Sequence, residues 1–380
     1  MRRAYLLGCL GLVLFEALGV YFIMPFPGSQ QLPSLAAAYL LHQWRWPVRL
    51  ALGLLTLAGL PDAWRQRSWR FGFVPALLLL AGGVTHAVNN VLAADAQFLQ
   101  PRVVRMVAAA ENAVAPDRLV VGVEVDGEAR AYPLQFIGYH HQVRDTVAGR
   151  PVLVSYCTVC RTGRVFSPVV DGRVESFRLV GMDRFNAMLE DATTGSWWRQ
   201  ANGEAVAGPR RGTVLEELPS RQVTLATWLA LYPHSRIMQA DSAFLGEYAK
   251  DYAYERGTSR KQLTGTDTAS WRDKSWVVGI TLGGASTAFD WNRLERERVI
   301  NAEVGGVPMV LALAADSASF FAFERPDRAT AFSLRGDSLV AGAAAYAFNG
   351  KGPAGALRPV NASQEFWHSW RTFQPRTARY

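Results

Sequence analysis

The sequence predicts about three N-terminal transmembrane α-helices followed by a mainly β (α+β) soluble region built from two tandem homologous units. Two observations carry this prediction. Hydrophobic residues make up 49% of the 380 residues, and their excess is concentrated before residue 95. Beyond residue 120 the chain repeats its own pattern, so that Val121 matches Val278. We expect four regions, which are the transmembrane region 1–95, repeat unit 1 at 96–239, a connector at 240–276 and a degenerate repeat unit 2 at 277–380.

The charge balance excludes several classes of protein. The chain has 40 Lys+Arg against 32 Asp+Glu, a formal net charge of +8. Its arginines are scattered, and no basic stripe is interleaved with aromatic residues, which argues against a nucleic-acid partner. The large apolar share excludes a disordered chain, a collagen and a small disulfide-dense scaffold.

The first predicted membrane span covers residues 4–24. This apolar run, broken only by Glu16, is long enough for a hydrocarbon core of about 30 Å. Arg2 and Arg3 precede it, which predicts a cytoplasmic N-terminus. The run is longer than the apolar part of a signal peptide, and no small-residue cleavage pattern follows it, so we expect an anchor. Inside the helical region Glu16 is expected to pair with a basic partner, the candidates being Arg45, Arg49 and His86.

Two further spans are predicted over residues 71–94, which carry no formal charge, and residues 34–60. The connecting loop between them is expected to be cytoplasmic because of its arginines, Arg65, Arg67 and Arg70. Three spans place the region after residue 95 outside the cytoplasm, whereas two would leave it inside. The predicted location is therefore a multi-pass protein of the cytoplasmic (inner) membrane, with the lipid bilayer as partner and the soluble region extracytoplasmic.

The repeat is carried by glycines, prolines and aromatic residues at fixed spacing, which indicates a shared backbone. Matched pairs include Gly122 with Gly279, Gly127 with Gly284, Gly149 with Gly306, Pro151 with Pro308, Phe166 with Phe323, and Trp228 with Trp370. Within the first unit, strands are predicted over 151–156 and 165–170. Helices are predicted over 182–190 and 225–232.

The chemical candidate is the pair Cys157 and Cys160, separated by two residues. The second unit has Ala314 and Ser317 at the matching positions, and it has a glutamate in place of His140. The repeated fold therefore does not need these side chains. A disulfide closing so short a loop would stabilise little, which also argues against a purely structural role.

A two-residue turn at 148–149 would place His140 opposite Cys157 on a β-hairpin. In that register Val143 faces Val154, and the apolar and polar side chains separate cleanly onto two faces. Cross-strand Cβ atoms lie about 4.5–5.5 Å apart, close enough for an imidazole and a thiol to share a metal ion or a proton.

This arrangement leaves several hypotheses open. The first is a soft-metal site for copper or zinc with Cys157, Cys160 and His140 as ligands and Asp145 in support. The second is a thiol–disulfide oxidoreductase, with Cys157 and Cys160 as the catalytic pair. Further alternatives are a cysteine nucleophile paired with His140 and an inert pair. A strand rather than a helix follows Cys160, so the thiol activation that a helix N-terminus gives is absent. Whether the chain is an enzyme stays open.

A polar cluster further along the chain is a candidate ligand pocket or support for the cysteines. Its members are Asp191, Thr194, Ser196, Trp198 and Gln200. The alternative interpretation is ordinary hydrogen bonding at turns and strand ends. A third hypothesis makes the soluble region a non-catalytic interaction or carbohydrate-type binding module, in which Trp197 and Trp198 matter. The partner would then be an unidentified extracytoplasmic protein or small ligand.

The region from about Val120 to the C-terminus resembles the domain-of-unknown-function family 3179. The resemblance rests on residues 140–145, 148–152 and 156–160, followed by 191–200 and 203–208. This chain has His141 where the family pattern has Glu, Arg144 where it has Asn, and Thr158 where it has Pro. A catalytic role for the acidic residue would therefore be lost here, whereas the cysteines and His140 are kept. The resemblance implies a shared fold and supplies no activity.

Overall fold

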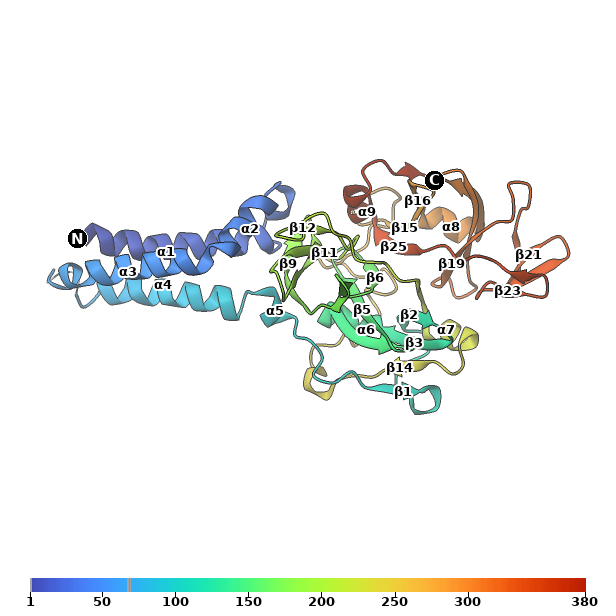
Figure 1. The fold of residues 1–380 in the computed structure, drawn as a ribbon, viewed down its shortest axis with the longest axis horizontal. Helices are drawn as coiled ribbons and strands as arrows, with labels where there is room; N and C mark the ends of the chain where they lie inside the picture. Colours follow the sequence, from blue (N-terminus) through green and yellow to red (C-terminus); the bar gives the residue numbers. More distant parts are fainter. Residues whose placement is uncertain (1, 67, 69) are drawn as a thin grey trace. The chain divides into compact units, whose positions relative to one another are not determined.

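The computed structural model describes residues 2–66, 68 and 70–380, which form two compact units (Figure 1). Unit 1 comprises Met1–Leu99, Ser176–Arg199 and Glu204–Thr213, and unit 2 comprises Gln100–Glu175, Gln200–Gly203 and Val214–Tyr380. A mainly β region follows the N-terminal helices, as the sequence predicts. The four sequence regions stay a prediction, because the compact units group the chain differently.

Unit 1 begins with the helices α1 (Arg2–Ile23), α2 (Leu35–Gln43), α3 (Arg45–Trp64), α4 (Phe73–Asn90) and α5 (Ala94–Gln97). Among the described residues, two helices, α1 and α4, are long and apolar enough to cross a membrane. The third predicted span is divided at Trp44 into α2 and α3. Arg45, Arg49 and Asp62 make α3 less apolar than the other two long helices.

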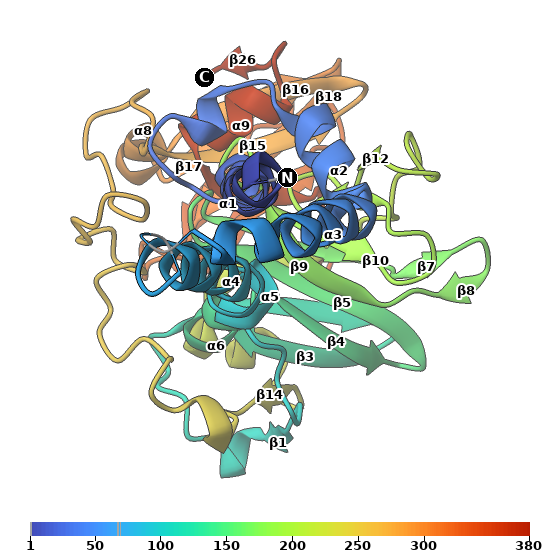
Figure 2. The ribbon, with the colours of Figure 1, turned by 90° about the vertical axis from the view of Figure 1, so that its left-hand side faces the viewer.

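Helices α1, α3 and α4 pack side by side (Figures 1 and 2). A Cβ added at Gly59 of α3 would lie 2.2 Å from the backbone N of Tyr5, and one added at Gly8 would lie 2.3 Å from Oγ1 of Thr56. These two contacts make α3 antiparallel to α1, and the glycines permit the close approach. The Tyr5 hydroxyl donates to the carbonyl of Val74 at the start of α4, at 2.6 Å.

The predicted ion pair inside this helical region forms with Arg49. Glu16, 2% exposed, accepts hydrogen bonds from Nε and Nη2 of Arg49 at 2.6 and 2.8 Å. Asn89 of α4 accepts from Arg49 at 2.7 Å and donates to Glu16 at 3.3 Å, so the polar contact joins three helices. His86 is not part of it and lies 3.3 Å from the side-chain amide of Asn90 instead.

Unit 1 also contains a four-stranded antiparallel sheet in the order β12-β11-β10-β9. Its strands are β9 (Phe177–Asp183), β10 (Asn186–Asp191), β11 (Trp197–Arg199) and β12 (Ala205–Ala207). The predicted helix over 182–190 is therefore wrong. Arg184 and Phe185 adopt left-handed φ angles of 51° and 67°, which turn the chain back into a hairpin.

The first part of unit 2 holds a five-stranded sheet in the order β1-β14-β3-β2-β13 and a three-stranded sheet β4-β5-β6. The elements are β1 (Met106–Ala108), β2 (Leu119–Val125), β3 (Glu128–Pro133), α6 (Leu134–His140), β4 (Gln142–Val147), β5 (Arg150–Cys157), β6 (Thr162–Phe166), β13 (Ser220–Thr224), α7 (Leu225–Leu231) and β14 (Arg236–Met238). They confirm the predicted strand over 151–156 and the predicted helix over 225–232. The predicted strand over 165–170 is divided between β6 and β7 (Val169–Val170).

The second part of unit 2 repeats the order of elements that begins at β2 and has no counterpart of β1. It contains β15 (Trp276–Leu282), β16 (Ala285–Asp290), α8 (Trp291–Glu297), β17 (Val299–Val304), β18 (Val307–Leu313), β19 (Phe320–Glu324), β25 (Ala362–Phe366), α9 (Trp367–Phe373) and β26 (Ala378–Arg379). A four-stranded sheet β25-β15-β16-β26 lies beside a three-stranded sheet β17-β18-β19. In each part, two antiparallel strands, a short helix and an antiparallel hairpin follow one another along the chain.

The remaining elements are short. They are the 3-10 helices η1 (Ser29–Gln31), η2 (Ala109–Glu111) and η3 (Ser242–Phe244), and the strands β8 (Arg173–Val174), β20 (Ser333–Arg335), β21 (Ser338–Ala341), β22 (Ala344–Ala347), β23 (Lys351–Gly352) and β24 (Gly355–Ala356). One apolar core of unit 2 contains side chains of both parts, for example Val154 of β5 and Val310 of β18. The two parts of unit 2 therefore bury surface against each other.

Candidate functional site

The two cysteines lie on the turn that joins β5 to β6. Cys157 is the last residue of β5 and pairs with Thr162, the first residue of β6. Arg161 closes the turn with a left-handed φ of 57°. The predicted hairpin position of the pair is confirmed, and Cys157 and Cys160 are both fully buried.

The hairpin has the predicted register, but His140 lies before its first strand rather than in it. Strand β4 begins at Gln142, which pairs with Ser155, and His140 is instead the last residue of α6. Its Nε2 atom is hydrogen-bonded to the Tyr248 hydroxyl at 2.8 Å. Helix α6 therefore contains His140, the residue that the predicted hairpin places opposite Cys157.

Asp145, the predicted supporting residue, is bound by two side chains of β3. Its carboxylate accepts two hydrogen bonds from Nη1 of Arg130, each at 2.6 Å, and one from the Tyr132 hydroxyl at 2.8 Å. Within the described part of the chain, no group of three His, Cys, Asp or Glu side chains is placed to hold a metal ion. The copper or zinc site stays a prediction.

Segments distant in sequence fix the backbone of the cysteine turn, because each of three successive turn carbonyls accepts a hydrogen bond. The pairs are Tyr254 Oη to Thr158 O at 3.0 Å, Lys274 Nζ to Val159 O at 2.8 Å, and the backbone N of Phe366 to Cys160 O at 2.9 Å. Two of the donors come from the connector and one from β25. The turn is therefore held in one conformation by groups that lie about 100 to 200 residues later.

Lys274 brings a positive charge to the cysteines. Burial lowers the pKa of its ammonium, and the negative charge that Cys160 and Cys157 carry when ionised opposes that shift. The same ammonium donates to the carbonyl of Leu263 at 2.6 Å and lies 3.3 Å from Nε2 of His368. A cation beside a thiol favours the thiolate, which is the reactive form of cysteine.

Two histidines near the turn are held neutral. Burial, together with the Lys274 charge, lowers the pKa of His368 to about 4. Burial also lowers the pKa of His141 to about 4, although its ring lies 2.8 Å from the carbonyl of Tyr156. His141 stands where the family pattern has an acidic residue, so its neutral ring adds no negative charge beside β5.

Arg161 is the largest polar side chain buried at the turn. Its guanidinium donates to Gln364 and to the carbonyls of Tyr254 and Glu255, at 2.8, 2.8 and 2.9 Å. The guanidinium carbon lies 3.8 Å from the centre of the Trp276 ring. A cavity of about 250 Å³ has Arg161, Trp276 and Gln364 in its wall, which places an opening beside the turn.

Lys274, His368 and Arg161 were not found as site residues from the sequence. The connector holds three of the four lysines, namely Lys250, Lys261 and Lys274. This concentration of lysines is the feature of the sequence that could have pointed to a functional lysine there. Nothing in the spacing distinguishes Lys274 from the other two.

The predicted polar cluster is split between the two units. Asp191 accepts hydrogen bonds from the Thr194 backbone N at 2.6 Å and from Trp198 Nε1 at 2.8 Å, and Thr194 Oγ1 lies 2.7 Å from Ser196 Oγ. This part lies in unit 1 and has the internal hydrogen bonding of a structural turn. Gln200 lies in unit 2, where its Nε2 donates to Ser155 Oγ at 3.2 Å and to the Thr162 carbonyl at 2.9 Å. Gln200 thus contacts β5 and β6 of the cysteine hairpin.

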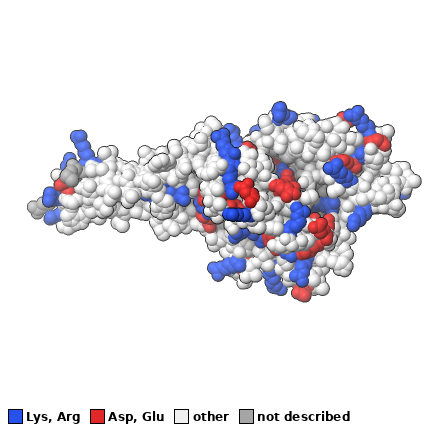
Figure 3. Space-filling model, in the orientation of Figure 1, with Lys and Arg blue, Asp and Glu red and all other residues white. Residues whose placement is uncertain are grey.

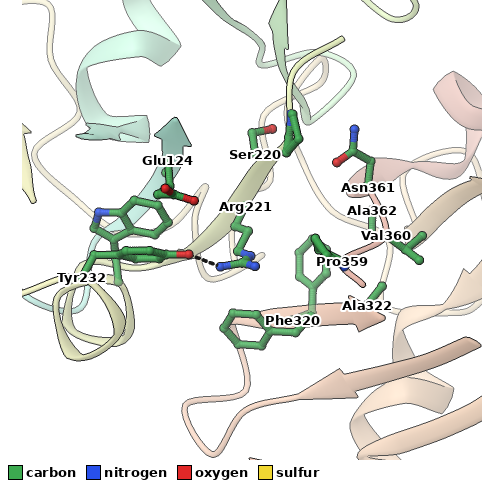
Figure 4. Close-up of a pocket in the computed structure, with 14 residues that line it drawn as sticks. Glu124, Ser220, Arg221, Tyr232, Phe320, Ala322, Pro359, Val360, Asn361 and Ala362 are labelled. Atoms are coloured by element: carbon green, nitrogen blue, oxygen red, sulfur yellow. Dashed lines mark hydrogen bonds between the residues drawn. The ribbon is translucent and has the colours of Figure 1, made fainter. Parts of the chain in front are cut away.

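A second hollow of unit 2, about 180 Å³ in volume, has Arg221 in its wall (Figure 4). Arg221 donates to the Tyr232 hydroxyl at 2.5 Å, and its guanidinium carbon lies 6.0 Å from the centre of the Phe321 ring. Glu124 lines the same hollow from β2. None of the residues that line it belongs to the cysteine turn, so this hollow is not part of the cysteine site.

A comparison with family models finds one match, described as "Protein of unknown function (DUF3179)", over residues 98–377. The match covers most of the chain and includes the cysteine turn, the connector and α9. No curated protein and no solved structure matches the chain.

Proposed function

Because the chain belongs to the DUF3179 family, whose function is unknown, its activity has to be inferred from its own residues, and we propose a membrane-anchored thiol–disulfide oxidoreductase. The catalytic pair is Cys157 and Cys160. The observation that carries the proposal is the Lys274 ammonium, which is bound to the turn between them. We rank this reaction above copper or zinc binding because, among the described residues, no group of three His, Cys, Asp or Glu side chains is placed to hold a metal ion.

The proposed reaction exchanges a disulfide of a partner for a disulfide within the turn. One cysteine thiolate attacks a partner sulfur, which forms a mixed disulfide and releases the other partner sulfur as a thiolate. The second cysteine, as thiolate, then attacks its neighbour's sulfur in the mixed disulfide. The Cys157–Cys160 bond forms, the partner leaves as a dithiol, and two electrons and two protons have passed to the partner. Lys274 stabilises the thiolate in each step.

Access is a requirement of this proposal, because both thiols are fully buried. Tyr254 and Lys274 of the connector and Phe366 of β25 are bonded to the turn and have to separate from it before a partner sulfur can reach the pair. The cavity that Arg161 lines offers space for the displaced groups. We therefore expect the resting protein to react slowly with thiol reagents in comparison with the same protein in mild denaturant.

The first prediction concerns the redox couple itself. The full chain, equilibrated in glutathione redox buffers, is expected to interconvert between a dithiol and a Cys157–Cys160 disulfide in a single two-electron transition. Mass spectrometry after acid quenching and alkylation measures the fraction oxidised. A Cys9→Ser chain is expected to keep the transition, and Cys157→Ser or Cys160→Ser is expected to abolish it.

Two results would contradict the proposal. One is a pair that stays reduced in every buffer. The other is a protein that purifies with stoichiometric copper or zinc lost in the Cys157→Ser/Cys160→Ser chain, which would restore the metal hypothesis. Both measurements use the same preparations. If the pair stays reduced, the metal content of the same sample shows whether a bound metal ion is the reason.

We also infer that the chain crosses the inner membrane three times, with α3 as the middle span. In support, α3 runs the length of α1, from Tyr5 beside Gly59 to Glu16 beside Arg49. A helix packed along a spanning helix has to occupy the same layer. The face of the helices drawn in Figure 3 is largely free of charged side chains. Leu54 and Leu57 of α3 are 58% and 63% exposed, as expected for side chains that face lipid.

The second prediction tests that topology. A reporter that is active only outside the cytoplasm is expected to be active when fused after residue 99 and inactive when fused in the loop at residue 66. A fusion after residue 33, which follows α1 and precedes α2, supplies the control for a single crossing and is expected to be active. Activity of the loop fusion, or inactivity of the fusion after residue 99, would contradict three crossings and leave the thiol chemistry in the reducing cytoplasm.

The two parts of unit 2 are further inferred to be tandem homologous units. The equal order of strands and helices supports this, as does the recurrence of Gly122 and Gly279 against Trp228 and Trp370. The second part of unit 2 then supports the cysteine site of the first part, since Phe366 and His368 of the second part contact the turn that carries the cysteines.

A further inference from the structure

A cavity of about 350 Å³ lies within unit 1 and has acidic and basic side chains in its wall. This wall is formed by the second half of α1, the junction of α2 with α3, the end of α4, and strands β9 and β10. Its size falls within the range of roughly 300–1,000 Å³ that small-molecule sites occupy. The proposed thiol reaction makes no use of it.

Most charges in this cavity are paired with one another. The pairs are Arg49 with Glu16 at 2.6 Å, Arg178 with Asp95 at 2.9 Å, Arg178 with Glu190 at 2.6 Å, and His42 with Glu190 at 2.6 Å. Burial raises the pKa of Glu190, but the hydrogen bond from His42 and the charge of Arg178 outweigh it and bring the pKa to about 2. Glu190 is therefore an anion at neutral pH.

Arg45 is the exception among the charges of the cavity. Its Nη1 donates to the carbonyl of His42 at 2.5 Å, and no carboxylate of the described residues lies within ion-pair distance of it. The wall holds three guanidinium groups and three carboxylates, so its formal charges balance, and the carboxylate charge that Arg178 leaves unmatched acts on Arg45 from Glu190. Arg45 still has N–H groups with no carboxylate at ion-pair distance, and an anionic oxygen can accept hydrogen bonds from them.

The position of the cavity identifies the source of such an anion. It lies at the ends of α1 and α4 that are remote from Arg2 and Arg3, where spanning helices reach the headgroup layer. Trp44 and Trp46, at the junction beside Arg45, are 54% and 67% exposed. Exposed tryptophans at the end of a membrane helix are typical of that interface.

We propose that this cavity binds the phosphodiester of a membrane phospholipid, with Arg45 as the group that contacts the phosphate. The acyl chains would lie along the exposed leucines of α3, Leu50 and Leu54. The inference rests on the membrane anchoring proposed above and is independent of the thiol reaction.

A pair of matched glycines provides the test. Gly19 lines the cavity, and a Cβ at Gly19 or at Gly53 of α3 would meet no atom within 4 Å. Both positions are helical and half-buried, but Gly53 does not line the cavity. Gly19→Leu fills the site, and Gly53→Leu is the control for leucine in a glycine position of the helices.

The full chain is purified in mild detergent, washed free of lipid, and titrated with dioleoyl phosphatidylglycerol in native mass spectrometry. One bound lipid per chain is expected, with affinity about tenfold lower in Gly19→Leu and unchanged in Gly53→Leu. Arg45→Gln is expected to weaken binding similarly, whereas Arg65→Gln, at a side chain 81% exposed, leaves it unchanged. Dioleoylglycerol, which lacks the phosphate, is expected not to bind.

Three outcomes overturn the proposal. Equal binding of dioleoylglycerol would show an apolar groove without phosphate recognition. Equal losses in Gly19→Leu and Gly53→Leu would show that the cavity is not the site. Competition by millimolar inorganic phosphate as strong as by the lipid would show a site for a soluble anion. Extraction of the chain from membranes by alkaline carbonate, measured separately, would contradict the anchoring itself.

Discussion

Replacing Lys274 with methionine is expected to lower the fraction of ionised thiol in the Cys157–Cys160 pair about tenfold at neutral pH. Methionine keeps the unbranched apolar part of the side chain and removes the ammonium that is bonded to the Val159 carbonyl. Without the cation, the pKa of the more acidic thiol is expected to rise. Titration of the thiolate ultraviolet absorbance measures this shift, and a Cys157→Ser/Cys160→Ser chain supplies the baseline.

Lys261→Met is the matched control, because Lys261 is an exposed lysine of the same connector. Its titration is expected to overlay that of the wild type. If Lys274→Met also overlays the wild type, the ammonium does not act on the thiols and the proposed oxidoreductase loses the observation that carries it. The rate of exchange with a small disulfide is also measured in mild denaturant, where the thiols are accessible in both chains. A lower rate in Lys274→Met under these conditions reflects loss of thiolate rather than loss of access.

The position of the cysteines could be predicted from the sequence because it depends on local rules. A two-residue turn at 148–149 and the alternation of apolar residues fix the register of β4 and β5, and this register is the one found. His140 lies two residues before β4, at the end of α6. His141 takes a left-handed φ of 59° between the helix and the strand, and the ring of His140 is hydrogen-bonded to Tyr248. Periodicity gives no warning of such a turn at a histidine.

The groups that surround the cysteines could not be predicted, because they come from far along the chain. Lys274 and His368 meet the turn only after the second part of unit 2 has packed onto the first. Ala314 and Ser317 stand in the second part where the first part has cysteines, so the sequence predicts no thiol chemistry for the second part. The second part instead contacts the cysteine turn through Phe366 and His368, and a contact between such distant segments leaves no local pattern in the sequence.

The membrane region shows the same division between local and distant information. Hydropathy found α1 and α4, and the cost of a buried charge predicted a partner for Glu16, which is Arg49. The division of the middle segment at Trp44 was missed, and so was the hairpin that replaces the helix predicted over 182–190. At the hairpin, two successive left-handed residues, Arg184 and Phe185, turn the chain, and the hydropathy pattern does not reveal them.

The largest loss of stability is expected at two glycines, Gly122 and Gly279. A Cβ at Gly122 would lie 2.3 Å from ring carbons of Trp228, and one at Gly279 would lie 2.2 Å from those of Trp370. These distances are far inside van der Waals contact, and both indoles are buried, so neither ring can move without opening the core. Each Gly→Ala substitution is expected to cost about 3 kcal/mol of unfolding free energy. Urea unfolding of the full chain, followed by tryptophan fluorescence, measures it.

Gly246→Ala provides the control, because a Cβ at Gly246 would meet no atom within 4 Å and the free energy of unfolding should change by less than about 0.5 kcal/mol. Gly122→Ala combined with Trp228→Leu should lose less than the two single losses added together, since the smaller side chain makes room for the new methyl group. Equal losses at Gly122 and Gly279 would mean that the two parts of unit 2 depend on the same contact between a strand and a helix. A loss at only one of them would mean that these two glycines are not equivalent, and the inferred duplication would then rest on the order of elements and on the other matched residues.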